Sequence, residues 1–181
     1  HLDEQGVERV EWIPQRSVKG VYYGTPIQGY GVNTCNTLTL WSARAMKELA
    51  LDAFNAGDYY RAVEDEVVSE TVTKILYPND EPAAGKQLRL LQQYFFVSCS
   101  LQDILHLIED LAGSHVRSLP DRVAVQLNDT HPSIAVAELM RLLMDERHLG
   151  WDESWRITVA TMGYTNHTLL PEALERWRVD L

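Results

Sequence analysis

The chain has 181 residues, of which 45% are hydrophobic and 23% charged, an ordinary composition for a globular domain with a hydrophobic core. Its formal net charge of -10 excludes a general binder of nucleic-acid backbones, which needs clustered lysine and arginine, but leaves neutral partners such as sugars open. No run reaches the roughly 18 apolar residues of a membrane span. No signal pattern opens the chain, and the two cysteines are typical of reduced free thiols, so we expect a cytoplasmic protein.

The first half of the chain predicts an extended segment followed by a capped helix. Residues 7–41 carry β-forming residues and turn signals, and residues 34–43 alternate threonine with leucine as a half-exposed strand does. Asp58 is placed to cap a helix over residues 59–76, which Pro78 ends. The apolar residues at roughly helical spacing in this helix are Tyr60, Val63, Val67, Val72, Ile75 and Leu76.

The second half predicts helices that alternate with short strands. After a loop over residues 78–86 comes the strongest helical pattern, which runs about 25 residues and ends near Gly113. Strands separated by helices indicate an α/β fold. The remaining predicted elements are a strand over 122–128, a tight loop, helices over 133–147 and 152–162 (the latter capped by Asp152), an extended stretch over 164–168 and a short helix started by Pro171.

Two polar junctions stand where predicted strands end. One is Asn128-Asp129-Thr130-His131 and the other is Asn166-His167-Thr168. Because ligands of α/β folds gather at the carboxyl ends of strands, the two junctions favour a polar pocket, and their mixed donors and acceptors suit a neutral polyol best. Two alternatives stay open. A loop histidine can be purely structural, and Asp129 or Thr130 can cap the following helix.

Three other motif interpretations are rejected. The run "NDEPAAGKQ" lacks the first glycine and the Ser or Thr of a phosphate-binding loop, and it follows a helix instead of a strand. The two Asn-X-Thr glycosylation sequons, at Asn128 and Asn166, are attributed to chance. The six histidines show no zinc-ligand spacing, so we expect no metal site.

Four stretches of the sequence resemble the α-glucan phosphorylases, which include glycogen, starch and maltodextrin phosphorylases. They follow one another in the family's order and at its spacings from about Tyr22 to the end of the chain. The third and fourth are long and specific. The stretches are "VNTCNTLTLWSARA", "ILYPNDEPAAGKQLRLLQQYFFVSCSLQDIL", "VAVQLNDTHPSIAVAELMRLLMD" and "YTNHTLLPEALERW".

The resemblance implies a two-lobed glycosyltransferase of the GT-B type, with residues 1–181 as a single segment of its N-terminal catalytic lobe. The C-terminal lobe, which carries the pyridoxal 5'-phosphate lysine and the phosphate-binding residues, is not in this chain, so no cofactor-binding residue is expected here. The implied reaction of the full-length enzyme is phosphorolysis of terminal α-1,4-linked glucose to glucose 1-phosphate. Its implied partners are an α-1,4-glucan, inorganic phosphate and a second copy in a homodimer.

The resemblance also implies site residues. His167 matches the catalytic-site histidine that hydrogen-bonds a hydroxyl of the glucosyl unit, a contact that can strengthen in the transition state. Asn79 and Asp80 match the start of a mobile loop that covers the site. The candidate substrate-binding residues are Asn79, Asp80 and Glu81 in that loop, Asp129 and His131 on the glucan side of the cleft, and Thr168 beside His167.

Several positions depart from the family pattern. Glu81 stands where the family often has asparagine, which argues against an amide contact to the sugar and adds a negative charge. Pro82 and Ala83 cannot stack like the aromatic residues of animal enzymes, and His106 and Leu107 replace the arginine pair that binds AMP there. We therefore expect a less regulated, bacterial type of enzyme. The alternative is a non-catalytic carbohydrate-binding fragment or a structural remnant without activity on its own.

Overall fold

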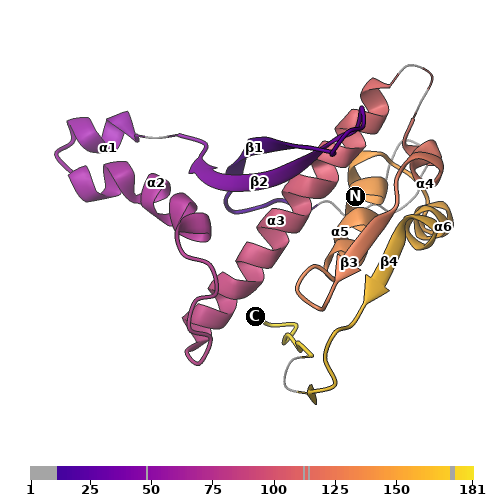
Figure 1. The fold of residues 1–181 in the computed structure, drawn as a ribbon. Coiled ribbons are helices and arrows are strands. Elements are labelled where there is room, and N and C mark those ends of the chain that lie inside the picture. The colour runs from indigo at the N-terminus through magenta and orange to yellow at the C-terminus, as the bar shows by residue number, and fades with distance from the viewer. Residues whose placement is uncertain (1–11, 48, 112, 114, 172–173) are drawn as a thin grey trace. The chain divides into compact units, whose positions relative to one another are not determined.

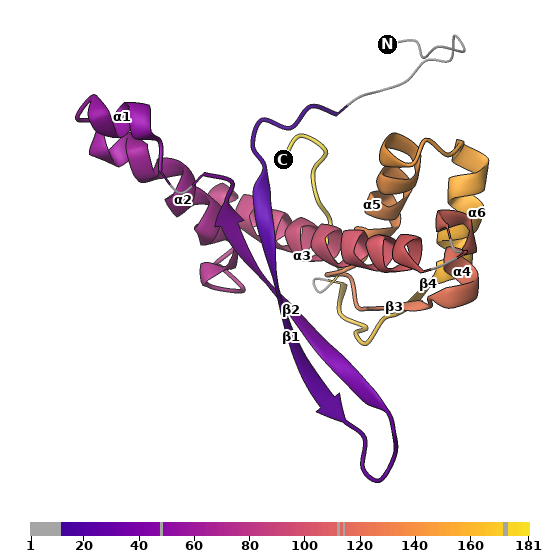
Figure 2. The same cartoon turned by 90° about the horizontal axis from the view of Figure 1, so that it is seen from above.

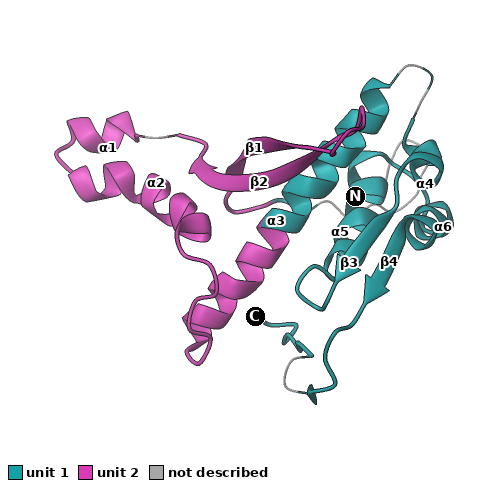
Figure 3. Cartoon of the chain, in the orientation of Figure 1, with its two compact units in different colours: residues 1–13, 96–181 teal, residues 14–95 magenta. Residues whose placement is uncertain are grey.

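The computed structural model describes residues 12–47, 49–111, 113, 115–171 and 174–181 (Figure 1). The chain separates into two compact units, one formed by residues 14–95 and the other by residues 96–181 together with residues 1–13 (Figure 3). Helices and strands occur in both, and the mixed content agrees with the predicted α/β class.

The unit of residues 14–95 begins with a long antiparallel hairpin of β1 (Val18–Gln28) and β2 (Cys35–Ala45), whose strands lie side by side along their length (Figure 2). The strands pair without interruption, and the turn closes where the Gly29 N–H donates to the Thr34 carbonyl at 2.9 Å. The predicted strand is therefore confirmed. The predicted extended stretch over residues 7–41 begins outside the described residues, and no structure is assigned to its first five.

The hairpin packs on α2 through small residues. Ala43 and Ala45 of β2 are buried, and the Ala43 N–H donates to Thr73 Oγ1 of α2 at 3.0 Å. Leu38 and Leu40, the apolar partners in the alternating pattern, are exposed. The alternation thus marks a strand correctly, but within this chain the leucine face is not the buried one.

Helix α2 (Tyr59–Lys74) follows the short helix α1 (Leu51–Asn55). Its predicted cap is confirmed, because Asp58 Oδ1 accepts the Arg61 N–H at 3.2 Å. The helix ends two residues before the predicted end. Of the residues that the spacing placed on an apolar face, Val72 is buried as predicted, but Tyr60 and Val67 are 91% and 53% exposed. The other buried residues of the helix are the small Ala62 and Ser69.

Helix α3 (Ala83–Asp110) has 28 residues and begins in one unit and ends in the other. It starts three residues before the predicted Lys86, because Pro82 accepts the first helical hydrogen bonds from the N–H groups of Gly85 and Lys86 at 3.0 and 3.1 Å. Both cysteines are free, Cys35 exposed and Cys99 half-buried in α3. Burial raises the pKa of the Cys99 thiol to about 11, which keeps it protonated and unreactive at neutral pH.

The second unit contains a β-α-β arrangement around the main hydrophobic core. Strands β3 (Val125–Asn128) and β4 (Met162–Thr165) pair in parallel, and α5 and α6 lie together on one side of them (Figure 2). The C-terminal half of α3 supplies Leu101, Leu105 and Ile108 to the core, where they join Leu127 and Leu139. After α3, the helical elements of this unit are a 3-10 turn (Val116–Ser118), α4 (Leu119–Arg122), α5 (Ala135–Arg141), a π-helical turn (Leu142–Glu146) and α6 (Trp151–Thr161).

Two predictions for this unit are wrong. Helix α4 occupies the first residue of the predicted strand, so β3 is shorter. Asp152 does not cap α6. The N-cap is Gly150, and Asp152 lies in the first turn, where a carboxylate interacts favourably with the helix dipole. The short helix predicted from Pro171 falls partly on residues 172–173, outside the described residues; Pro171 has 3-10 geometry, its carbonyl accepts the Leu174 N–H at 3.1 Å, and residues 174–181 are not helical.

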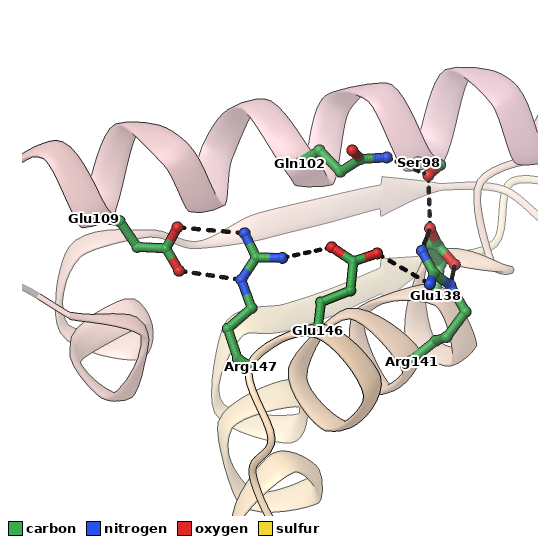
Figure 4. A network of polar contacts seen from close by, with 7 residues as sticks. All are labelled: Ser98, Gln102, Glu109, Glu138, Arg141, Glu146 and Arg147. Atoms are coloured by element: carbon green, nitrogen blue, oxygen red, sulfur yellow. Dashed lines mark hydrogen bonds and ion pairs between the residues drawn. The ribbon is translucent and has the colours of Figure 1, made fainter. Parts of the chain in front are cut away.

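A buried carboxylate ties α3 to α5 (Figure 4). The side chain of Glu138 is 2% exposed and receives both the Ser98 hydroxyl, at 2.6 Å, and the Arg141 guanidinium, at 2.8 and 2.9 Å. Burial of a carboxylate is costly unless donors surround it, and here three donor atoms do. The contact therefore fixes the approach of the two helices.

The same network continues outward through alternating charges. Arg141 also pairs with Glu146 at 3.0 Å, and Arg147 pairs with Glu146 at 2.8 Å and with Glu109 of α3 at 3.1 Å (Figure 4). The Glu109 and Glu146 side chains are 35% and 41% exposed, so solvent screens this outer part more than the Glu138 contact.

We predict that Glu138→Ala lowers the free energy of unfolding by about 3 kcal/mol, because it leaves the Arg141 charge and the Ser98 hydroxyl without their buried acceptor. Chemical denaturation of the 181-residue chain measures this loss. Glu146→Ala is the matched control and is expected to cost less than about 1 kcal/mol, since the Glu146 side chain is 41% exposed whereas that of Glu138 is 2% exposed. Equal losses for the two variants would contradict the special role of the buried carboxylate.

Candidate functional site

The candidate site lies at the edge where β3 and β4 end (Figure 1). Asn128 and Thr165, the last residues of the two strands, are register partners, and the strands run in the same direction. The loops that follow them therefore leave the sheet at the same edge. The predicted convergence of the two polar junctions is confirmed at the level of the backbone.

Asp129 joins the two loops. Its backbone N–H donates to the Thr165 carbonyl at 2.9 Å, which continues the strand pairing by one step. Its Oδ1 accepts the backbone N–H of His167 at 2.7 Å. Asp129 has φ +66°, a left-handed conformation that aspartate and asparagine tolerate better than most residues.

These contacts decide one of the open alternatives. The N-cap of α5 is Ile134, which makes no side-chain capping bond, and the Asp129 carboxylate is bonded to the β4 loop instead. Asp129 is therefore not the helix cap that its position in the sequence allowed. The turn before α5 is closed by Ser133, whose N–H and hydroxyl both donate to the Thr130 carbonyl, at 3.1 and 2.7 Å.

The loop that carries His167 is braced by its own neighbours. Asn166 and Thr168 exchange two hydrogen bonds, from Asn166 Nδ2 to the Thr168 carbonyl at 2.8 Å and from the Thr168 N–H to Asn166 Oδ1 at 3.2 Å. Thr168 Oγ1 then accepts the Leu170 N–H at 3.1 Å. His167 itself is exposed. Its backbone is held while its imidazole faces solvent.

The sequence interpretation missed the role of Asn166. An asparagine side chain can bond both the N–H and the carbonyl of the residue two positions on, as Asn166 does with the backbone of Thr168. That local chemistry was the available signal. His131 lies half-buried in the loop between β3 and α5.

The remaining candidates, Asn79, Asp80 and Glu81, lie in the other unit, between α2 and α3. Asn79 Oδ1 accepts the Glu81 N–H at 3.1 Å, which shapes the loop as an Asx turn. Asp80 pairs with Arg89 of α3 at 2.9 Å, and the Arg89 guanidinium lies 6.0 Å from the centre of the Tyr77 ring. Arg89, which the sequence interpretation missed, thus fastens the loop to the first turns of α3.

Gly85 permits this loop to approach the helix. A Cβ at Gly85 would lie 1.8 Å from the Asn79 carbonyl oxygen and 2.9 Å from its carbon, distances that no side chain can occupy. The position is inside a helix, where glycine is otherwise less favourable than alanine by about 1 kcal/mol. The close approach of the loop, and not helix propensity, therefore explains why glycine occupies this position.

We predict that Gly85→Ala displaces the 79–81 loop and destabilises its packing by about 1–3 kcal/mol, although helix propensity alone would make alanine stabilising. Faster hydrogen exchange of a peptide covering residues 77–85 would report the displacement. Ala84→Ser, at the exposed neighbouring position, is the matched control and should leave exchange near that of the unmodified chain. A Gly85→Ala chain with unchanged or slower exchange would show that the close approach does not constrain the loop.

Two further properties bear on what the site can bind. Within the described residues, no group of three histidine, cysteine, aspartate or glutamate side chains is arranged to hold a metal ion. None of the helices in the described ranges is both long and apolar enough to cross a bilayer. The polar groups at the strand edge are backbone amides, carboxylate, amide and hydroxyl oxygens, and imidazole, which match the hydroxyl groups of a polyol.

Comparison with known proteins places the chain in a family. The carbohydrate phosphorylase family matches it over residues 1–181, and the chain belongs to this family. The resemblance noted from the sequence motifs is thereby confirmed.

The relatives it matches are glycogen phosphorylases. The chain is 56% identical over 183 residues to the glycogen phosphorylase of a Synechocystis strain, covering 100% of the chain and 21% of that relative. It is 45% identical over 185 residues to the muscle form of Ovis aries and 48% identical over 178 residues to the liver form of Homo sapiens, which cover 98% and 94% of the chain. The chain spans about a fifth of the length of these relatives, 21% to 22%.

Proposed function

We propose that the full-length protein is an α-glucan phosphorylase, which uses inorganic phosphate to release terminal α-1,4-linked glucose as glucose 1-phosphate. Family membership over the whole chain supports the reaction class. The single structural observation that supports a sugar site is the hydrogen bond from the His167 N–H to Asp129, which joins the two polar loops at one strand edge. The chain is a segment of the N-terminal lobe of a two-lobed, GT-B type enzyme in this proposal.

Within this proposal His167 is the catalytic candidate of the segment. Its exposed imidazole hydrogen-bonds a hydroxyl of the glucosyl unit and does not transfer a proton to the reacting bond. Such a contact assists turnover when it is stronger in the transition state than in the bound substrate. His131 and Thr168 lie on the same two loops and line the sugar side of the site.

The loop of Asn79, Asp80 and Glu81 serves as the gate in this proposal. Its internal Asx turn and its ion pair with Arg89 give it a defined resting position on α3. Loops that cover active sites commonly limit access and product release. Glu81 is exposed and adds a negative charge to this gate, so it is not assigned an amide-like contact to the sugar.

The cofactor of the family, pyridoxal 5'-phosphate, belongs to the full-length enzyme in this proposal. The residues of this segment do not fit it: the four lysines, Lys19, Lys47, Lys74 and Lys86, are all exposed, whereas a lysine that forms a Schiff base needs a desolvated setting. No step of the reaction is assigned to the cofactor here. The segment's share is recognition of the sugar and gating, and we expect no phosphorolysis from it alone.

The wider properties of the protein follow from the same proposal. The partners are the glucan, inorganic phosphate and a second copy of the full-length chain, and the location is the cytoplasm. His106 and Leu107 are exposed on α3, where animal enzymes carry an arginine pair for AMP, so we expect a bacterial type of enzyme without animal-type AMP activation. The net charge of -10 disfavours binding to polyanions such as nucleic acid.

We predict that His167→Ala in the full-length enzyme lowers kcat about tenfold to a hundredfold, because one transition-state hydrogen bond is lost. Release of glucose 1-phosphate from maltodextrin and phosphate measures the change. His106→Ala, which removes an exposed histidine from α3, is the matched control and should retain the rate of the unmodified enzyme. Unchanged turnover of the His167 variant would refute its assigned role, and sugar binding without any turnover by the unmodified full-length protein would favour the non-catalytic alternative.

A further inference from the structure

We propose that Asp129 is a positioning residue for His167, and that it acts through an acceptor oxygen and not through its negative charge. The inference rests on the proposed function of His167 and revises the role that the family resemblance implies for Asp129. Instead of contacting the glucan, the Asp129 carboxylate holds the backbone on which the sugar-binding histidine stands.

Asp129 lies where the strand pairing ends. The register of β3 and β4 stops at Asn128 and Thr165, one residue before the His167 loop begins. Beyond that point two bonds from Asp129 connect the loops: its N–H to the Thr165 carbonyl, 2.9 Å, and its Oδ1 to the His167 N–H, 2.7 Å. Asp129 thus extends the ladder with a backbone donor and a side-chain acceptor.

The other contacts of the His167 loop do not join it to β3. The Asn166–Thr168 bonds shape the loop internally but do not connect it to β3. The His167 side chain is exposed, so burial does not fix it either. The bond from the His167 N–H to Asp129 Oδ1 ties residues 166–168 to the β3 side of the sheet.

The bond to His167 needs an acceptor oxygen on residue 129 but no negative charge. The donor to Oδ1 is a neutral backbone amide, so an uncharged carbonyl oxygen in the same place can accept the same bond. Asparagine supplies that oxygen and also tolerates the φ of +66°. Glycine adopts this φ without strain but has no acceptor. The pair Asp129→Asn and Asp129→Gly therefore separates the acceptor from both the charge and the backbone conformation.

The experiment uses the full-length enzyme with Asp129→Asn, Asp129→Gly, His167→Ala and the Asp129→Gly/His167→Ala double variant. We expect Asp129→Asn to retain most of the turnover and Asp129→Gly to lose about tenfold in kcat, with little change in KM, because a misplaced His167 contact matters most in the transition state. The double variant should be no slower than His167→Ala alone, since both changes remove the same contact.

Hydrogen exchange of a peptide covering residues 164–170 gives a readout that does not depend on activity. Exchange at His167 should accelerate in Asp129→Gly and stay near the unmodified level in Asp129→Asn. The proposal is overturned if Asp129→Asn loses as much turnover as Asp129→Gly, which would assign a direct role to the charge, or if Asp129→Gly leaves exchange unchanged. Normal turnover in His167→Ala would refute the proposed function of that histidine, while the exchange result would still decide whether Asp129 holds it.

Discussion

The parallel pairing of β3 with β4 is the constraint on which the candidate site depends. It brings residue 128 next to residue 165, although 36 residues separate them in sequence. Leu127, buried in the core, fixes which face of β3 points inward, and a slip of one residue would turn that face to solvent. Because β4 follows α6 without a linker, the end of that helix also sets where the second strand begins.

The buried Glu138 restricts the position of α5, the helix that follows the β3 loop. Helix α5 follows the β3 loop directly, so its position sets the position of His131 and its neighbours. Hydrophobic contacts alone allow a helix to slide, because they have little directionality. A carboxylate that receives Ser98 from α3 and Arg141 from its own helix allows far less movement, since each donor must keep its direction. These directional bonds orient α5, whereas a buried ion pair is by itself weak evidence for net stability.

The sequence predicted those parts of the structure that depend on local chemistry. The cap at Asp58, the long helix and the polar ends of two strands all follow from patterns within a few residues. The errors arise where tertiary contacts decide. The leucines of β2 are exposed because the strand packs through its small alanines. Asp129 does not cap the helix because its carboxylate accepts the His167 N–H of the neighbouring loop. The family resemblance named candidate site residues, but it could not specify which of them bond each other.

Strained backbone conformations occur in or directly beside both candidate segments, the 78–82 loop and the loop that carries Asp129. Of the described residues other than glycine, Tyr77, Asp129 and His148 have positive φ. Tyr77 directly precedes the 78–82 loop and Asp129 lies in the site, and each such conformation costs on the order of 1–3 kcal/mol unless neighbouring contacts hold it. At Asp129 the two bonds to the β4 loop hold it, and near Tyr77 the Arg89 guanidinium and the Asp80 ion pair do. Local propensity disfavours these conformations, so patterns in the sequence do not predict them. Their presence in both candidate segments is consistent with selection for placement of side chains over local stability.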